Sequence, residues 1–353
     1  MPASTPGPVG ILCNPASGKD IRRLTARAST FDNQEKFAIV RRAVRGAIAA
    51  GATEFLYIPD GHDIAESAFA EVRSDLDSAG IPQINAKPVD APKTDSALDT
   101  IHGARALRDM GCAVTLTIGG DGTNRAFTRG WPNAPLIPLS TGTNNVFPRM
   151  IEATVAGTAA GLVATGRLPL TEVASQAKTV QVKVAGEASD HALIDAALTS
   201  DRFVGSRALF DPSRLRSLLL TRGDASGIGL SSIGGLIDPI GDDEDAGLLI
   251  QFGSGGFAIR APIAPGCHES LDIQSVRRVK FEERIEFEGL GALAFDGERE
   301  RILKPGQKAE LWIDRSGPWV IDVDEVHTRA ARAGWFRIPA DTGRKPNSPL
   351  SAA

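Results

Sequence analysis

The first 150 residues alternate between short apolar runs and longer stretches with helical periodicity. The apolar runs have the length of buried strands and cover residues 9–13, 54–58, 83–89, 113–118 and 134–140. Residues 32–51 and 94–111 instead repeat apolar positions every three or four residues, as helices do when they bury one face. In the second of these helices, Leu98, Ile101 and Leu107 are expected to face the core. Strands that alternate with helices predict an open parallel sheet with helices on both faces.

From about residue 164 the pattern changes to many short apolar or alternating runs separated by Gly, Asp and Pro. Such a pattern predicts a mostly antiparallel β-sandwich. A helix over residues 150–171 is expected to bridge the two parts. Residues 308–324 are expected to form a hairpin that turns at Ser316-Gly317.

The chain has 353 residues, more than one hydrophobic core usually organises. We therefore expect an α/β nucleotide-binding domain over residues 1–150, a β-rich domain over 151–340 and a disordered tail over 341–353. Apolar residues make up 42% and charged residues 23%, which is ordinary for a globular protein. The net charge of −4 predicts no broad attraction to nucleic acid or to an anionic membrane, so neither is expected as a partner.

The remaining bulk features favour a cytoplasmic protein. The first ten residues lack the basic and apolar regions of a signal peptide. Cys13, Cys112 and Cys267 lie far apart and form no CxxC pair, which favours buried thiols in a reducing compartment. No apolar run approaches membrane-spanning length.

A glycine-rich corner follows the run at 113–118. Residues 119–123, Gly-Gly-Asp-Gly-Thr, come where a parallel strand would reach the ligand-binding edge of its sheet. Glycines let the backbone approach a phosphate closely, and a helix that begins there offers unpaired N–H groups. Asp121 would repel phosphate, so we expect it to hold Mg²⁺ or to accept a proton from an attacking hydroxyl. The simpler alternative is a tight turn with a helix cap.

A second polar loop strengthens the functional interpretation. Residues 140–145, Ser-Thr-Gly-Thr-Asn-Asn, follow the next strand and open onto the same sheet edge. Two common nucleotide fingerprints fail. The dinucleotide pattern GxGxxG needs glycine where Arg125 stands, and the P-loop pattern fails at Cys13 and at Asp20.

Three motifs in order resemble those of one superfamily. NPASGK at residues 14–19, GGDGT at 119–123 and FDGE at 295–298 are similar to motifs of the NAD kinase/diacylglycerol kinase superfamily. Over most of its length, the chain is most similar to the acetoin-catabolism protein X-like branch, an ATP-NAD kinase-like group. The resemblance implies an N-terminal α/β domain, a C-terminal β-sandwich and a nucleotide between them. It also implies a kinase that uses ATP and Mg²⁺.

The resemblance assigns roles to individual residues. Asp121 is the implied catalytic carboxylate, and Asp296 and Glu298 are the implied metal ligands. The implied nucleotide and phosphate contacts lie in three loops: Asn14, Ser17, Gly18 and Lys19; Gly119, Gly120, Gly122, Thr123 and Asn124; Thr141, Gly142, Thr143 and Asn144. Residues 291–303 also read as two strands around an Asp-Gly turn, which would place both late carboxylates at a sheet end, although a solvated hairpin tip has the same pattern.

The acceptor site departs from both kinds of relative. NAD kinases carry an Asn-Glu pair where this chain has Ile194-Asp195, and lipid kinases carry GTGND where it reads GTNNV. We therefore expect the acceptor to be a hydroxyl of a soluble small metabolite, with Asp195, Arg202 and His62 as candidate contacts. The alternatives are NAD, a lipid, or a non-catalytic protein that only binds nucleotide. The resemblance also suggests a homodimer.

Overall fold

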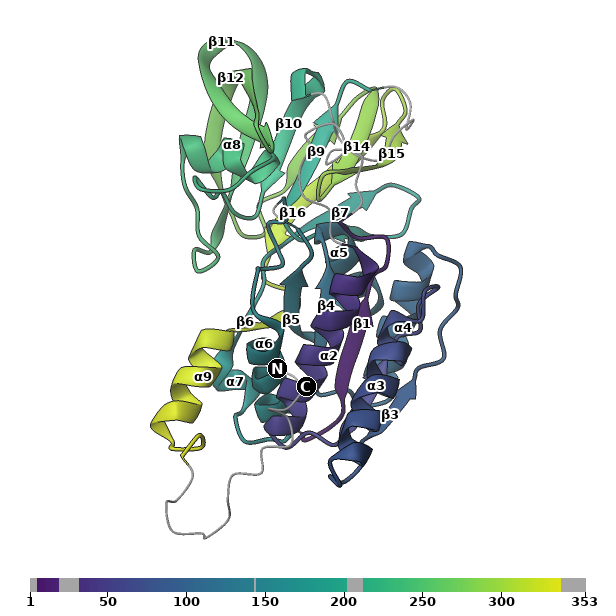
Figure 1. Ribbon diagram of the computed structural model, residues 1–353. Coiled ribbons are helices and arrows are strands. Elements are labelled where there is room, and N and C mark those ends of the chain that lie inside the picture. Colours follow the sequence, from purple (N-terminus) through teal and green to yellow (C-terminus); the bar gives the residue numbers. More distant parts are fainter. Residues whose placement is uncertain (1–4, 19–31, 143, 202–211, 338–353) are drawn as a thin grey trace.

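The computed structural model describes residues 5–18, 32–142, 144–201 and 212–337. It has two halves, a lower one built around a sheet with helices on both faces and an upper one made mostly of strands (Figure 1). This arrangement confirms the predicted fold class. The tail predicted to be disordered, 341–353, lies outside the described residues.

The lower half contains a seven-stranded sheet in the order β3-β2-β1-β4-β5-β17-β6. Its strands are β1 (Val9–Cys13), β2 (Glu54–Tyr57), β3 (Asn85–Pro88), β4 (Val114–Gly119), β5 (Pro135–Ser140), β6 (Ala174–Gln176) and β17 (Trp319–Ile321). The first five strands are parallel, β17 joins parallel to β5, and β6 is antiparallel to β17. Every residue of β1 and β4 is buried, as expected for central strands covered on both faces.

Helices cover both faces of this sheet. They are α2 (Asn33–Ala49), α3 (Ile64–Ser78), α4 (Ala97–Asp109), α5 (Asp121–Gly130), α6 (Ala153–Ala164), α7 (Leu170–Val173) and α9 (Val323–Arg332). One apolar core lies between the sheet and α2, α3, α6 and α9, and another lies under α4 and α5. A Cβ at Gly157 would lie 1.9 Å from the Ala43 carbonyl oxygen, so only glycine lets α6 approach α2 this closely.

The upper half contains two antiparallel sheets, in the orders β12-β11-β10-β9-β14-β15 and β13-β16-β7-β8. Their strands are β7 (Thr179–Val184), β8 (Asp190–Ala192), β9 (Asp195–Thr199), β10 (Leu215–Leu220), β11 (Ala246–Ala264), β12 (Cys267–Lys280), β13 (Ile285–Glu288), β14 (Gly291–Phe295), β15 (Glu298–Leu303) and β16 (Lys308–Asp314). Apolar side chains from both sheets form one core, and a second cluster lies beside α8 (Leu230–Ile237). The expected antiparallel sheets are therefore present.

The chain returns to the lower half near its end, which corrects two predictions. Residues 308–324 do not form a hairpin, because β16 pairs with β7 and β13 whereas β17 pairs with β5 and β6. Likewise, α6, α7, β6 and α9 pack with the lower sheet, so the β-rich part does not span residues 151–340. Turn residues such as Ser316-Gly317 mark a change of direction, but they do not determine which strand the chain pairs with next.

One predicted core residue is also placed differently. Leu98 is 55% exposed, whereas Ile101 and Leu107 are buried as expected. Leu98 lies in the first turn of α4 and lines a large pocket between the halves. Its position in the sequence has the periodicity of a core residue, but this first turn of α4 lies at the pocket and not over the sheet.

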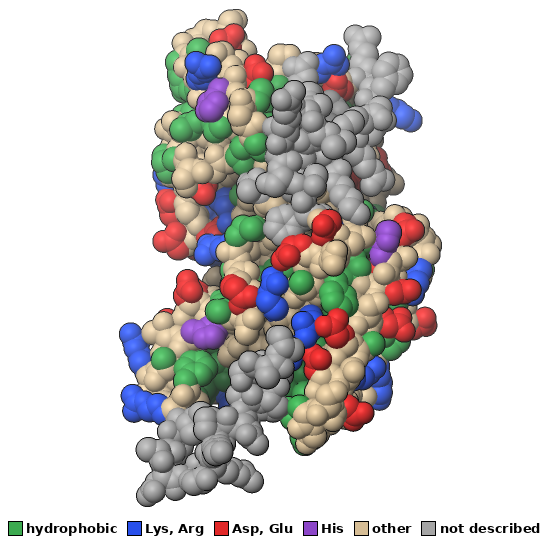
Figure 2. Space-filling model, viewed as in Figure 1, with side chains coloured by type: hydrophobic (Ala, Val, Ile, Leu, Met, Phe, Trp, Pro, Cys, Tyr) green, Lys and Arg blue, Asp and Glu red, His purple; other side chains and the backbone are tan. Residues whose placement is uncertain are grey.

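The surface has a mixed charge pattern on the face drawn in Figure 2, where acidic and basic side chains are interspersed rather than gathered by sign. This agrees with the small net charge of the chain. Within the described ranges, no helix has the length and apolar character needed to cross a bilayer.

A partly buried histidine, His191, lies where α5 meets β8 at the junction of the halves. Nε2 of His191 is 2.8 Å from Oγ1 of Thr128. Burial, and after it the charge of Arg125, lowers the pKa of His191 to about 4, although Asp190 opposes the shift. The folded junction therefore holds a neutral imidazole at neutral pH.

This neutral histidine predicts a loss of stability in acid. The pKa of His191 is about 4 in the folded state against an ordinary value of 6.5, so the unfolded chain binds the proton first as the pH falls. The contribution is fully present above pH 6.5 and is lost towards pH 4, by at most about 2 kcal/mol at pH 5. Urea unfolding at pH 7 and at pH 5 should show a smaller loss in His191→Gln than in the wild type. An equal pH dependence in both proteins would contradict this assignment.

Candidate active site

A pocket of about 1250 Å³ lies between the two halves, at the carboxyl ends of β1 and β4. The lower half contributes the loop after β1 and the start of α5, and the upper half contributes the turn between β14 and β15. In open α/β sheets, ligands bind outside the carboxyl ends of the parallel strands. The pocket occupies that position, with the upper half as its second wall.

The glycine-rich corner forms the start of α5. Gly120 is the N-cap of the helix and Asp121 its first residue, and both line the pocket together with Gly122 and Thr123. The N-cap Gly120 has no side chain, and the first turn of the helix, with its N–H groups and the positive end of the helix dipole, lies at the pocket wall. The Glu298 side chain of the upper half reaches this turn, since its Oε1 would lie 3.0 Å from a Cβ placed on Gly122.

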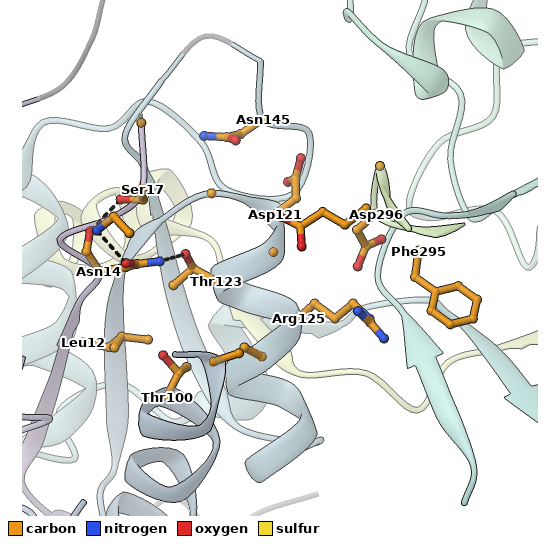
Figure 3. A pocket seen from close by; sticks show the side chains of 18 of the residues that line it. Leu12, Asn14, Ser17, Thr100, Asp121, Thr123, Arg125, Asn145, Phe295 and Asp296 are labelled. Carbon is orange, nitrogen blue, oxygen red and sulfur yellow. Dashed lines mark hydrogen bonds between the residues drawn. The ribbon is translucent and has the colours of Figure 1, made fainter. Parts of the chain in front are cut away.

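The loop after β1 is tied to α5 and to the loop after β5. Asn14 donates from Nδ2 to Oγ1 of Thr123 at 2.8 Å, and the Ser17 hydroxyl donates to the Asn14 carbonyl at 2.8 Å (Figure 3). Oγ1 of Thr141 lies 3.0 Å from Oγ of Ser17. Asn14, Ser17 and Gly18 all line the pocket, so the loop after β1 and the GGDGT turn meet there.

A fully buried lysine, which none of the sequence motifs indicated, holds the same loop. Nζ of Lys36, on α2, donates to the carbonyl oxygens of Pro15 at 2.8 Å and Ser17 at 2.7 Å. Lys36 is in phase with the buried Val40 and Ala43. A lysine within the apolar stripe of a helix was the signal that could have revealed it.

Backbone amides hold the Asp121 carboxylate. The N–H of Val146 lies 3.1 Å from each of its oxygens, and the N–H of Phe147 lies 2.8 Å from Oδ1. These donors belong to the polar loop after β5, whose Asn145 side chain is itself bonded to Ser140 at 2.8 Å. The loop therefore orients the proposed catalytic carboxylate.

A second carboxylate faces Asp121 from the upper half (Figure 3). Asp296 occupies the two-residue turn between β14 and β15, where it has a positive φ of 50° and the following Gly297 a φ of 76°. Its oxygens accept bonds from the amides of residues 193–195, at distances of 2.7 to 3.3 Å. Oδ1 of Asp195 in turn accepts from the Gly297 amide at 3.3 Å.

Burial raises the pKa of Asp296 to about 6. The Asp121 charge adds to this effect, while Arg125 and the amides of Leu193 and Ile194 oppose it. The pocket therefore contains an acidic group whose protonation changes near neutral pH.

Some predicted contacts lie away from the pocket. Asn124 is fully buried, and its side chain accepts from the Thr117 hydroxyl at 2.6 Å and donates to a carbonyl of the preceding turn at 2.9 Å. It therefore stabilises the start of α5 instead of facing a ligand. Gly119, Thr141 and Gly142 are also buried and do not line the pocket.

The other predicted site residues divide into two groups. Asn144, Asp195 and His62 line the pocket. Lys19, Thr143 and Arg202 lie outside the described residues.

The predicted metal ligands do not form a ready-made metal cage. In the described part of the chain, no three His, Cys, Asp or Glu side chains are grouped to hold an ion. Both oxygens of Asp296 accept backbone bonds, and Glu298 lies against Gly122. Mg²⁺ commonly keeps several waters and binds only one or two carboxylates beside substrate phosphates. The carboxylates in this pocket are compatible with such a site.

Two family models match successive parts of the chain. Residues 9–168 match the ATP-NAD kinase N-terminal domain, and residues 178–316 match the acetoin catabolism protein X C-terminal domain. The border between the matches falls at the point where the chain passes from the lower sheet into the upper half.

Individual relatives agree with these models. Acetoin catabolism protein X of Cupriavidus necator is 35% identical over 335 residues, which is 92% of each chain. A crystal structure of yeast NADH kinase complexed with NADH has a TM-score of 0.54 at 14% identity, covering 97% of this chain and 94% of that one. The likeness to yeast NADH kinase shows a shared fold. The identity to acetoin catabolism protein X shows that the chain belongs to the acetoin catabolism protein X family, within the NAD kinase/diacylglycerol kinase superfamily.

Proposed function

We propose that the protein is an ATP- and Mg²⁺-dependent kinase that transfers the γ-phosphoryl group to a hydroxyl of a small metabolite. The observation that carries this proposal is the placement of Asp121. It stands at the start of a helix that begins in a glycine-rich turn, in a large pocket, opposite a second carboxylate from the other half.

The phosphate end of the pocket supports the proposal. Gly120 and Gly122 bring bare main chain to the pocket wall, and the first turn of α5 presents N–H groups and the positive end of the helix dipole. Asn14, bonded to Thr123, joins the loop after β1 to this wall. Such a surface seats an anionic polyphosphate without a cluster of basic side chains.

Asp121 is then the group that acts on the acceptor hydroxyl. The Val146 and Phe147 amides fix the direction of its carboxylate, so it can orient the hydroxyl or accept its proton during transfer. Mg²⁺, held between phosphates and one of the carboxylates Asp121 or Glu298, would offset charge on the transferring group.

NAD is the alternative acceptor, because of the match to the ATP-NAD kinase domain. The Asn-Glu pair expected of NAD kinases is Ile194-Asp195 here, and both of these residues donate their amides to Asp296. These main-chain bonds do not depend on side-chain type, but the buried apolar side chain of Ile194 offers no polar group to a nucleoside, which favours a different acceptor. A non-catalytic nucleotide-binding protein would not need two opposed carboxylates.

The first test is a search for phosphoryl transfer. We expect the purified protein, given γ-labelled ATP, Mg²⁺ and separate hydroxyl compounds, to label a short hydroxyketone or polyol in preference to NAD. Preferential labelling of NAD would establish the alternative acceptor. ATP binding in equilibrium dialysis without a labelled product from any compound would indicate a non-catalytic role.

Asp121→Asn tests the catalytic assignment. The amide oxygen still accepts bonds from the loop, so the protein should fold with an unchanged melting temperature, but kcat should fall by roughly 100-fold or more. Asp324→Asn is the matched control, because it removes a carboxylate from the first turn of the remote α9. Wild-type turnover in Asp121→Asn would rule out the assignment.

Lys36→Met tests the support of the phosphate loop. Methionine fits the apolar stripe of α2 but leaves the Pro15 and Ser17 carbonyls without their donor, so the loop should lose its conformation. We expect the dissociation constant for ATP to rise about tenfold. Calorimetric titration measures it, and an unchanged constant would show that the loop does not contribute to nucleotide binding.

A further inference from the structure

Arg125 lies on α5, four residues after Asp121, and the two side chains therefore lie on the same side of the helix (Figure 3). Its side chain is only 6% exposed. Arginine is seldom buried to this extent unless its charge is paired and its N–H groups are bonded.

Arg125 crosses the junction and bonds to several strands of the upper half. Nη2 lies 2.9 Å from Oδ2 of Asp190, and Nε donates to the His191 carbonyl at 2.8 Å, both on β8. Nη1 lies 2.6 Å from Oε1 of Glu300 on β15, and Cζ lies 5.0 Å from the centre of the Phe295 ring on β14.

The contacts of Arg125 lie next to the two groups that hold Asp296, which are its turn and the amides of residues 193–195. Phe295 comes directly before Asp296, and Glu300 stands on the strand that leaves the same turn. His191 lies just before the segment 193–195, whose amides hold the Asp296 carboxylate. The turn and its amide cradle are thus both fastened to the helix that carries Asp121.

We propose that Arg125 is a positioning residue that holds the Asp296 turn and its amide cradle at a set distance from Asp121. It acts through these groups and not on the reacting atoms. The catalytic part of this inference rests on the proposed phosphoryl transfer, whereas the structural part does not.

Arginine is suited to this role for a geometric reason. Its planar guanidinium offers donors in fixed directions, so one side chain can bond at once to Asp190, the His191 carbonyl and Glu300. Lysine has the same charge as a single point and cannot span these three acceptors. Lysine at position 125 should therefore keep the charge and lose most of the positioning.

The kinetic test compares Arg125→Met, Arg125→Lys and Glu300→Gln with Arg301→Gln as control. Arg301 bonds Asp190 at 3.4 Å and also pairs with Glu187, but all three residues belong to the upper half, so the control removes an arginine without cutting the junction. We expect kcat to fall about 100-fold in Arg125→Met and about tenfold in Arg125→Lys and Glu300→Gln. The KM for ATP should stay within twofold of the wild-type value, and kcat of the control within twofold.

A second measurement does not depend on activity. Hydrogen exchange of a peptide covering residues 193–195 should become at least tenfold faster in Arg125→Met, or in Arg125→Lys if the methionine variant does not fold, and unchanged in Arg301→Gln. Unchanged exchange, a kcat within threefold of the wild type, or a loss of kcat matched by an equal loss of folded protein would overturn the proposal. If the wild type transfers phosphate to no acceptor, the proposed function fails, and the exchange result still decides the role of Arg125.

Discussion

Main-chain amides hold two carboxylates that face each other across the junction, and the geometry of the site depends on this arrangement. Asp121 comes from the lower half and is held by the loop at Val146 and Phe147. Asp296 comes from the upper half and is held by the amides of residues 193–195. Backbone donors have no rotamer freedom, so each carboxylate is as well fixed as the loop that holds it. The distance between the two carboxylates is therefore set by the contacts that join the two halves.

The first five strands of the lower sheet and the glycine-rich corner were predictable because their signals are local. Apolar runs, amphipathic stretches and a glycine-rich turn each depend on neighbouring residues. The GGDGT segment joins the end of the buried strand β4 directly to the start of α5, as its sequence predicts. The Asp296-Gly297 turn is equally local, since its two residues adopt the positive φ that a tight hairpin requires.

What the sequence did not reveal depends on distant partners. Arg125 bonds to residues 65 and 175 positions further along the chain, and no local pattern indicates such pairs. Asn124 was misplaced for a different reason: its partners Thr117 and Gly120 are near in sequence, but the pattern does not tell whether its side chain turns towards them or towards the pocket. The pairing of β17 with β5 is likewise a tertiary choice between two possible neighbours for one short strand.

The return of β17 to the lower sheet has an architectural consequence. β6 leads into the upper half and β17 leads out of it, and the two are antiparallel neighbours joined between Gln176 and Trp319. Their continuations are also bonded, from the Ala177 amide to the Pro318 carbonyl at 2.9 Å. The upper half is therefore a module spliced into what would otherwise be a simple β6–β17 connection. Excising it and closing the gap with a short turn would leave the strand order of the lower sheet unchanged.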